Sequence, residues 1–359
     1  MYSSKSPRIA RAILAAAAAA AGIIMAAATA ARADIYLNAY VSNWGNTSID
    51  VVPYDVTNST WGAATTLVTS SEIDEPLGLV LGYGGNLFAA NYGNSTIAEI
   101  SNLGGSPSVS VFTSSPDGLT GLTDLAYDPI NQNLYVSGTT GLGNGTGGIV
   151  EVTPTGSVTL LEQAGSTSGG LYKPKGVAVG AVGNTNVYAV NSDGGISQIP
   201  AAGGPATEVV SAGGLGTGAD GPAFDAGGNL FVATYTAAGT VYEVTGLTSN
   251  GGAGSGTVST AFSTGYNSDN LAFGPNGDLL VAYTASGTSS SYTDTLGEWG
   301  LGPSGWSQVG TVGSGFNGPS AVGVPEPATL SLLALGGLGL LLARRRRRRT
   351  EGHDGLVTQ

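Results

Sequence analysis

The stretch GPAFDAGGNLFVATYTAAGTVYEV (residues 221–244) contains three short apolar segments separated by turn-forming residues. Gly228 and Asn229 stand between the first two segments, and Gly and Asn tolerate the positive φ that tight hairpins require. Residues 240–244 alternate polar and apolar side chains with the period of two that is typical of a half-buried strand. The stretch therefore predicts three consecutive antiparallel strands.

The same pattern recurs along the chain, in residues 78–100, 124–152, 176–199, 221–244 and 270–299. A weaker fourth strand is predicted after several of these units, for example at residues 108–113, 158–161 and 207–210. Four short strands in every forty-odd residues are typical of propeller blades, whereas a parallel β-helix has a period about half as long. The repeats therefore predict an all-β propeller of four-stranded antiparallel blades.

The two ends of the repeat region are incomplete in complementary ways. Residues 35–52 match the second and third strands of a unit, and residues 318–324 match a first strand with nothing after it. If the last piece supplies the innermost strand of the first blade, the number of complete blades is six. The ring then lacks the exposed sheet edges that an open array would have. We therefore predict a six-bladed β-propeller over residues 34–324, closed by its C-terminal strand.

Composition excludes several classes of function. The 359-residue chain has 60 Gly and no Cys, so it has neither disulfides nor a thiol nucleophile. Residues 34–323 contain 21 acidic side chains and two lysines, a net charge of −19, which disfavours nucleic acid and anionic membranes as partners. The only histidine, His353, follows an arginine cluster outside this body, so His-based catalysis is not expected in the propeller.

The N-terminus is typical of an export signal. Lys5, Arg8 and Arg11 precede an Ala-rich apolar run, and Ala31 and Ala33 occupy the −3 and −1 positions before Asp34. A surface helix of the mature protein would need a polar face, which this run lacks. We expect residues 1–33 to be a signal peptide for the Sec export machinery, removed before Asp34.

The C-terminus combines an uncharged apolar run, residues 328–343, with six arginines, residues 344–349. A helix of this length nearly spans a bilayer core, and the arginines are costly to translocate. We therefore predict a transmembrane helix at 328–343, a cytoplasmic tail at 350–359 and a propeller on the outer side of the membrane. A buried core helix, the alternative, would not be followed by six like charges.

Together, the Pro-Glu-Pro segment, the apolar run and the arginines resemble the PEP-CTERM sorting signal of Gram-negative bacteria, typically ones that make extracellular polysaccharide. The signal would occupy residues 324–349, with its marker residues at Val324, Pro325, Glu326, Pro327, Arg344, Arg345 and Arg346. The resemblance implies an exosortase as a partner. It also implies transient anchoring in the inner membrane, followed by delivery to the cell surface or the extracellular space.

The repeats resemble NHL-type units, whose core phrase is Gly-Asn-Leu-Tyr-Val-Ala-Asp. Residues 85–91 and 228–234 come closest to it, but the family's Asp is replaced by Asn91, Asn191 or Thr234 in this chain. In addition, Asp220-Gly221-Pro222 is similar to the Glu-Gly-Pro at a metal ligand of gluconolactonase-type propellers. This second resemblance implies a metal-binding channel mouth.

Residues that precede the first strand or end the second strand of a unit are expected to surround one mouth of the channel. The first group includes Glu75, Asp124, Asp220 and Asp269, with Lys175 in the fourth blade, and the second includes Asn91, Asn191, Thr234 and Tyr283. Converging carboxylate and amide oxygens suit Ca²⁺, so the four acids are candidate metal ligands and the second group candidate ligand-facing residues. Alternatively, the acids are turn residues that face water.

Five aromatic residues are candidates for stacking on sugar rings or for packing between blades: Tyr40, Trp44, Tyr92, Trp299 and Trp306.

Two functions remain open. The first is a non-enzymatic binding or structural protein at the cell surface or in the extracellular polysaccharide matrix, with polysaccharide or surface proteins as partners. The alternative is a Ca²⁺-dependent, lactonase-like hydrolase that uses the acidic channel mouth. We expect the first of these, without enzymatic activity.

Overall fold

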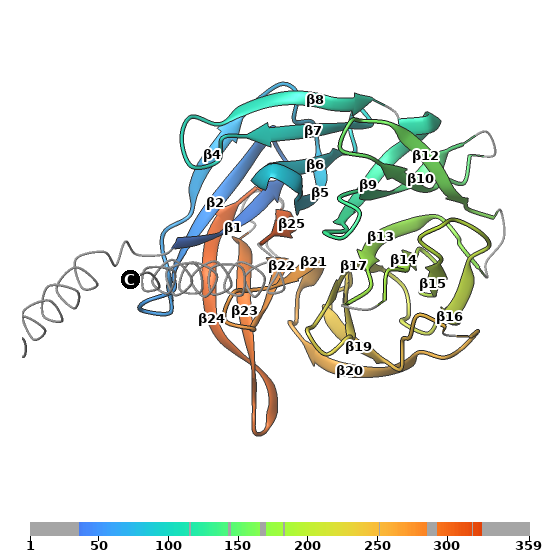
Figure 1. Cartoon of the computed structure of the whole chain (residues 1–359). Helices are drawn as coiled ribbons and strands as arrows, with labels where there is room; N and C mark the ends of the chain where they lie inside the picture. Colours follow the sequence, from blue (N-terminus) through green and yellow to red (C-terminus); the bar gives the residue numbers. More distant parts are fainter. Residues whose placement is uncertain are drawn as a thin grey trace, which may run out of the picture.

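Six antiparallel sheets surround one axis in the computed structural model (Figure 1). The structure describes residues 36–324 except 115, 143–144, 166–169, 182–183, 251, 286–292 and 318. The predicted signal peptide, transmembrane helix and cytoplasmic tail lie outside the described residues. Within the described residues, no helix is long and apolar enough to cross a membrane.

Blades 2 to 6 each contain four strands in chain order, beginning with the innermost. Blade 2 consists of β5 (Pro76–Leu81), β6 (Leu87–Asn91), β7 (Thr96–Ser101) and β8 (Ser108–Ser114). Blade 3 consists of β9 (Leu119–Tyr127), β10 (Leu134–Gly141), β11 (Gly148–Val152) and β12 (Val158–Gln163). Blade 4 consists of β13 (Pro174–Val179), β14 (Val187–Asn191), β15 (Ile196–Ile199) and β16 (Thr207–Val210).

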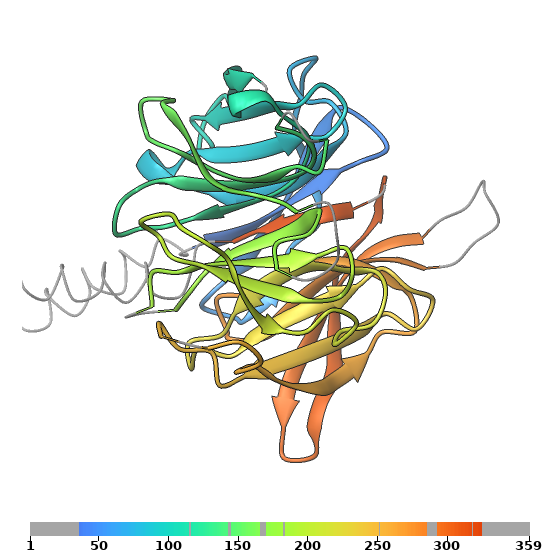
Figure 2. The same cartoon turned by 90° about the vertical axis from the view of Figure 1, so that its right-hand side faces the viewer.

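The last two complete blades follow the same plan. Blade 5 consists of β17 (Ala219–Phe224), β18 (Leu230–Thr234), β19 (Thr240–Thr245) and β20 (Thr257–Ser263). Blade 6 consists of β21 (Asn267–Phe273), β22 (Leu279–Ala285), β23 (Thr293–Gly302) and β24 (Gly305–Phe316). The long hairpin of β23 and β24 projects beyond the disc (Figure 2). Two short 3₁₀ turns, η1 (Tyr83–Gly85) and η2 (Pro116–Gly118), complete the regular structure of the described residues.

Blade 1 is built from both ends of the repeat region, as predicted. Its inner strand is β25 (Pro319–Gly323), which pairs antiparallel with β1 (Tyr36–Asn43), and β1 pairs with β2 (Ser48–Asp55). Beyond β2 lie two short pieces, β3 (Thr60–Trp61) and β4 (Thr65–Thr69), in place of one outer strand. The division falls at Pro53, which has no N–H to offer to an outer neighbour.

Apolar side chains fill the space between blades. Tyr188 of blade 4 is fully buried, for example, and meets Phe224 of blade 5 edge to face with ring centroids 5.1 Å apart. Such packing depends on the two-residue period of each strand, which turns alternate side chains toward the two neighbouring blades.

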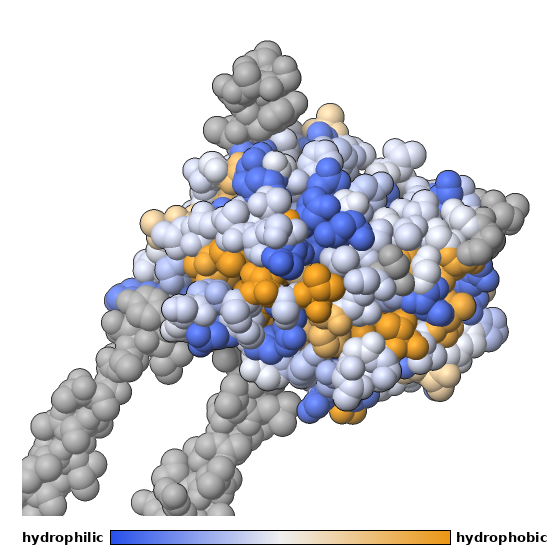
Figure 3. Space-filling model, turned by 90° about the horizontal axis from the view of Figure 1, so that it is seen from above, coloured by the Kyte–Doolittle hydropathy of each residue, from blue (hydrophilic) through white to orange (hydrophobic). Residues whose placement is uncertain are grey.

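The outermost strands contain β-bulges, which interrupt their regular pairing with the third strand of the blade. In β8, β12 and β16 the extra residues are Phe112, Leu161 and Val209, which have no partner in the ladder of the adjacent strand. Bulges twist an edge strand and hinder its pairing with another chain. Figure 3 views this rim and shows exposed apolar side chains in a band bordered by hydrophilic and near-neutral residues.

The innermost strands approach so closely that three of them need glycine at the same position. A Cβ on Gly78 or Gly221 would lie 2.6 Å from the Cα of Asp124 or Asn270 in the next blade, and one on Gly176 would lie 2.4 Å from the carbonyl oxygen of Asp220. These are closer than carbon and oxygen atoms can approach without displacement of the neighbouring strand.

We predict that Gly78→Ala and Gly221→Ala each lower the free energy of unfolding by about 1–3 kcal/mol, because the added methyl group forces adjacent inner strands apart. Urea denaturation measures this. Gly104→Ala is the matched control, since a Cβ there meets nothing within 4 Å. Equal stability of all three variants and the wild type would contradict the close approach of the inner strands.

Candidate functional site

One end of the channel is surrounded by the first residues of the six innermost strands, and we call this side of the disc the mouth face. Near the start of each of these strands the pairing with the second strand is interrupted by a β-bulge. From blade 1 to blade 6 the bulged residues are Ser320, Leu77, Thr123, Lys175, Asp220 with Gly221, and Asp269 with Asn270. A bulge re-aims side chains out of the regular alternation, and this one recurs around the mouth.

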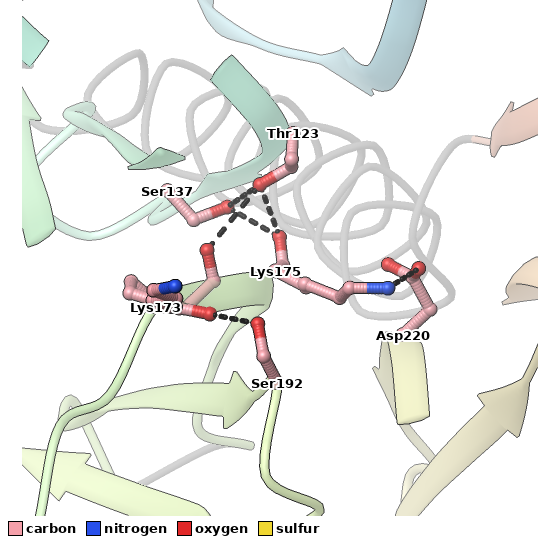
Figure 4. A network of polar contacts seen from close by, with 7 residues as sticks. Thr123, Ser137, Lys173, Lys175, Ser192 and Asp220 are labelled. Carbon is pink, nitrogen blue, oxygen red and sulfur yellow. Dashed lines mark hydrogen bonds and ion pairs between the residues drawn. The ribbon is translucent and has the colours of Figure 1, made fainter. Parts of the chain in front are cut away.

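Lys175 and Asp220 form the one ion pair between described residues. Lys175 Nζ lies 3.2 Å from Asp220 Oδ2, and both side chains are partly buried. The carbonyl oxygen of Lys175 accepts hydrogen bonds from the hydroxyl groups of Thr123 and Ser137, both at 2.6 Å (Figure 4). Asp220 raises the pKa of Lys175, so the lysine stays charged and its charge is matched by the neighbouring carboxylate.

Asp124 lies deeper, 5% exposed, and its carboxylate accepts backbone N–H groups from two blades. Its Oδ1 accepts from Leu125 N and its Oδ2 from Val177 N, each at 2.9 Å. Asn270 Nδ2 of blade 6 approaches Oδ1 to 3.5 Å. Because blades 3 and 6 stand on opposite sides of the axis, this contact spans the channel.

Burial controls the titration of the three mouth aspartates. It raises the pKa of Asp124 to about 7, although the two backbone N–H groups act in the opposite direction. Burial also raises the pKa of Asp220, against the effect of Lys175. The pKa of Asp269 is raised well above its ordinary value by burial and by the charge of Asp220.

The residues predicted to bind Ca²⁺ do not come together as a ligand set. Glu75 is exposed and has a φ of 48°, and no contact joins it to the three aspartates. Asp124 uses both oxygens to accept N–H groups, while Asp220 pairs with Lys175. Across the described ranges, no three His, Cys, Asp or Glu side chains are close enough together to hold a metal ion. Within the described residues, the four predicted ligands are therefore not gathered into one cluster.

The predicted ligand-facing residues point into the protein. Asn91 and Asn191 are fully buried and play the same part in blades 2 and 4. Asn91 Oδ1 accepts from Asp74 N, and its Nδ2 donates to Glu72 O and Thr96 Oγ1. Asn191 binds Tyr172 N, Gly170 O and Ser197 Oγ in the same way. Each asparagine thus fixes the segment that precedes the innermost strand of its own blade.

Thr234 and Tyr283 are also buried. Thr234 Oγ1 donates to Thr240 O at 2.8 Å, and the Tyr283 ring lies between Tyr266 and Trp299. At the end of a strand, alternation does not determine which way a side chain points, which explains why the sequence suggested exposure for all four residues.

The five candidate aromatic residues divide into two groups. Tyr40 and Trp299 are buried, and Trp306 packs against Phe231 and Phe262. Trp44 and Tyr92 are 50% and 42% exposed. The sequence analysis missed two further exposed residues, Tyr235 at 50% and Tyr266 at 38%. Alignment of the repeats would have found Tyr235, because Trp44, Tyr92 and Tyr235 each follow directly after the second strand of a blade.

Comparison with known proteins identifies the end of the chain. The family model of the PEP-CTERM protein-sorting motif matches residues 323–348. The chain carries a PEP-CTERM sorting motif. The motif begins at the last residue of β25, so the strand that closes the ring runs directly into the sorting signal. No curated protein matches the chain.

Solved structures match the propeller of this chain. A structure of a nidogen/laminin complex has a TM-score of 0.61 and 14% identity, covering 81% of this chain and 99% of that chain. Streptogramin B lyase has a TM-score of 0.51 and 11% identity, covering 80% and 91%. A gluconolactonase from Xanthomonas campestris has a TM-score of 0.48 and 13% identity, covering 70% and 84%. At these identities the likeness to the first two structures shows the fold alone.

We predict that the protein is more stable at pH 5 than at pH 8. The unfolded chain loses the Asp124 proton near pH 4, whereas the folded protein keeps it up to a pH of about 7. The stabilisation is therefore complete below pH 4 and is lost as the pH rises through 7, and the raised pKa values of Asp220 and Asp269 act in the same direction.

The measurement is the melting temperature at both pH values. In Asp124→Asn the difference should shrink, and the protein should be less stable overall because an amide cannot accept both N–H groups. Asp117→Asn, at an exposed turn, is the control that should keep the wild-type profile. A wild-type protein that is more stable at pH 8 than at pH 5 would refute the account of the buried aspartates.

Proposed function

We propose that this exported, PEP-CTERM-sorted propeller is a non-enzymatic binding or structural protein of the cell surface or of the extracellular polysaccharide matrix. The observation that carries the proposal is the state of the mouth, where Lys175 pairs with Asp220 and Asn270 meets Asp124 across the axis. With these groups engaged with one another, the outer surface of the mouth face is the place where a ligand would meet the protein.

The same contacts weigh against the hydrolase alternative. A carboxylate that activates water, directly or through a metal, must keep an oxygen available for it. Asp124 uses both oxygens within the fold, and Asp220 is paired with the amine of Lys175. For Asp269, burial and the charge of Asp220 raise the pKa well above its ordinary value and so disfavour the carboxylate form that a general base needs. The lactonase-like structure is similar in fold alone, which does not transfer its activity.

The sorting motif supports delivery to the outside of the cell. Processing by an exosortase near Val324 to Pro327 would follow Sec export, while the predicted helix at 328–343 and Arg344 to Arg346 hold the C-terminus at the inner membrane. Because the described propeller extends to Val324, removal of everything after the motif's start leaves the closing strand in place.

We predict that the double variant Pro325→Ala, Glu326→Ala accumulates in the membrane fraction of a host that contains an exosortase, because its membrane helix is no longer removed. The full-length wild-type protein should be found at the cell surface or in the extracellular matrix. Fractionation and immunoblotting measure this, with Glu351→Ala in the C-terminal tail as the control that is sorted normally. Wild-type distribution of the double variant, or retention of the wild-type protein inside the cell, would refute the proposed route.

A further inference from the structure

Three exposed aromatic residues occupy one repeated position on the mouth face. Trp44, Tyr92 and Tyr235 directly follow β1, β6 and β18, the second strands of blades 1, 2 and 5, and are 50%, 42% and 50% exposed. The equivalent residues of blades 3, 4 and 6 are Thr139, Ser192 and Thr284, which are partly buried. Blade 6 supplies an aromatic residue from the segment before β21 instead, because Tyr266 is 38% exposed.

These four residues, which we call the aromatic arc, belong to the consecutive blades 5, 6, 1 and 2. Contacts between β17 and β21, β21 and β25, and β25 and β5 establish this order around the ring. The arc therefore borders more than half of the mouth. The remaining part is bordered by hydroxyl side chains of blades 3 and 4.

The backbone holds the arc in place. Tyr92 N donates to Glu75 O at 3.1 Å and Tyr235 N to Gly218 O at 2.7 Å, so each tyrosine is tied to the segment that leads into the innermost strand of its own blade. Next to Trp44, Gly45 N donates to Asn317 O at 2.9 Å in the corresponding way. The Tyr266 ring is stacked on buried Tyr283, with centroids 5.3 Å apart and planes at 9°. The main chain is thus fixed beside Trp44, Tyr92 and Tyr235, and the ring itself is fixed at Tyr266, which lowers the loss of conformational freedom on binding.

The charges around the arc determine what it can bind. Of the two lysines at the mouth, Lys175 is matched by Asp220, with Asp269 close enough to raise its pKa further, and exposed Lys173 lies over the Tyr172 ring, 5.7 Å from its centroid. Because the net charge over residues 34–323 is −19, an anionic polymer is repelled overall despite this one exposed lysine. A protein partner would bury a continuous apolar core, whereas these rings stand on four separate blades among hydroxyl and amide side chains.

We propose that the aromatic arc binds an uncharged polysaccharide, with the aromatic rings stacked on the apolar C–H faces of its sugar rings. The surrounding hydroxyl and amide groups supply hydrogen bonds to sugar hydroxyls. This inference rests on the proposed binding role and adds the ligand class and the residues that contact it. Polysaccharide binding also explains why these aromatic side chains are exposed, since packing of the blades does not require them there.

The test is affinity electrophoresis of the secreted protein in native gels that contain hydroxyethylcellulose, galactomannan or dextran as neutral probes and alginate as the anionic probe. The wild-type protein should be retarded by at least one neutral probe and not by alginate. Trp44→Ala, Tyr92→Ala and Tyr235→Ala should each weaken that retardation about threefold to tenfold, and the triple variant should abolish it.

Ile130→Ala and Leu301→Ala are matched controls on the opposite face, where the native side chains are 72% and 68% exposed, and they should behave like the wild type. Unchanged melting temperatures establish that every variant is folded. Retardation by alginate, no retardation by any neutral probe, or wild-type retardation of the triple variant would each overturn the inference.

These outcomes distinguish failure of the inference that the aromatic arc binds polysaccharide from failure of the proposed function. If the triple variant still binds the neutral probe but is lost from the cell surface, the arc contacts a protein, which overturns the inference and leaves the surface role intact. Failure of the wild-type protein to reach the cell surface would overturn the proposed function whatever the gels show.

Discussion

Ring closure through the pairing of β25 with β1 is the interaction on which the rest of the structure depends. Tyr40, Val41 and Ser42 of β1 face Gly323, Val322 and Ala321 across this ladder. Ala321 is buried in the apolar cluster shared by blades 1 and 2, and Val322 in the cluster shared by blades 6 and 1. Five residues from the far end of the chain thus join three blades. Without them, β1 would be an open edge and the positions around the mouth would no longer be fixed.

The closed ring also supports the proposal that a ligand would meet a face of the disc and not its channel. Glycine at the inner positions of blades 2, 4 and 5 allows adjacent strands to approach closely, while Asp124 and Asn270 meet across the axis. In this narrow centre, burial disfavours the charged forms of Asp124, Asp220 and Asp269 and raises their pKa values. Lys175 pairs with one of the three, Asp220, and burial disfavours the charged form of the other two.

The fold could be predicted from the repeats, because the number of blades and the closing strand follow from a sequence pattern that recurs every forty-odd residues. Complementary end pieces at residues 35–52 and 318–324 were sufficient to predict six blades and a C-terminal closing strand, and the structure confirms both. The division of the outer strand of blade 1 was not predicted, since it depends on the missing N–H of a single proline, Pro53.

The site was harder to predict because bulges shift the register by one residue. The sequence analysis placed Asp124 in the same group as Asp220 and Asp269, yet the bulge residue of blade 3 is Thr123, and Asp124 lies one position further along, inside the channel. A shift of one residue moves a side chain to the other face of a strand, and single-sequence periodicity does not reveal it. The exposed aromatic residues follow strand ends, where only alignment of the repeats by their second strands shows that Trp44, Tyr92 and Tyr235 are equivalent.

Closure is tested most directly by the thermal unfolding of two chains that begin at Asp34 and end at Asn317 or at Val324. The shorter chain lacks β25 and should lose about 3 kcal/mol or more of stability, because Ala321 and Val322 no longer cover their clusters and β1 loses its inner partner. Its melting transition should therefore be lower by several degrees and less cooperative. If the two chains melt at the same temperature with the same cooperativity, β25 does not hold the ring closed.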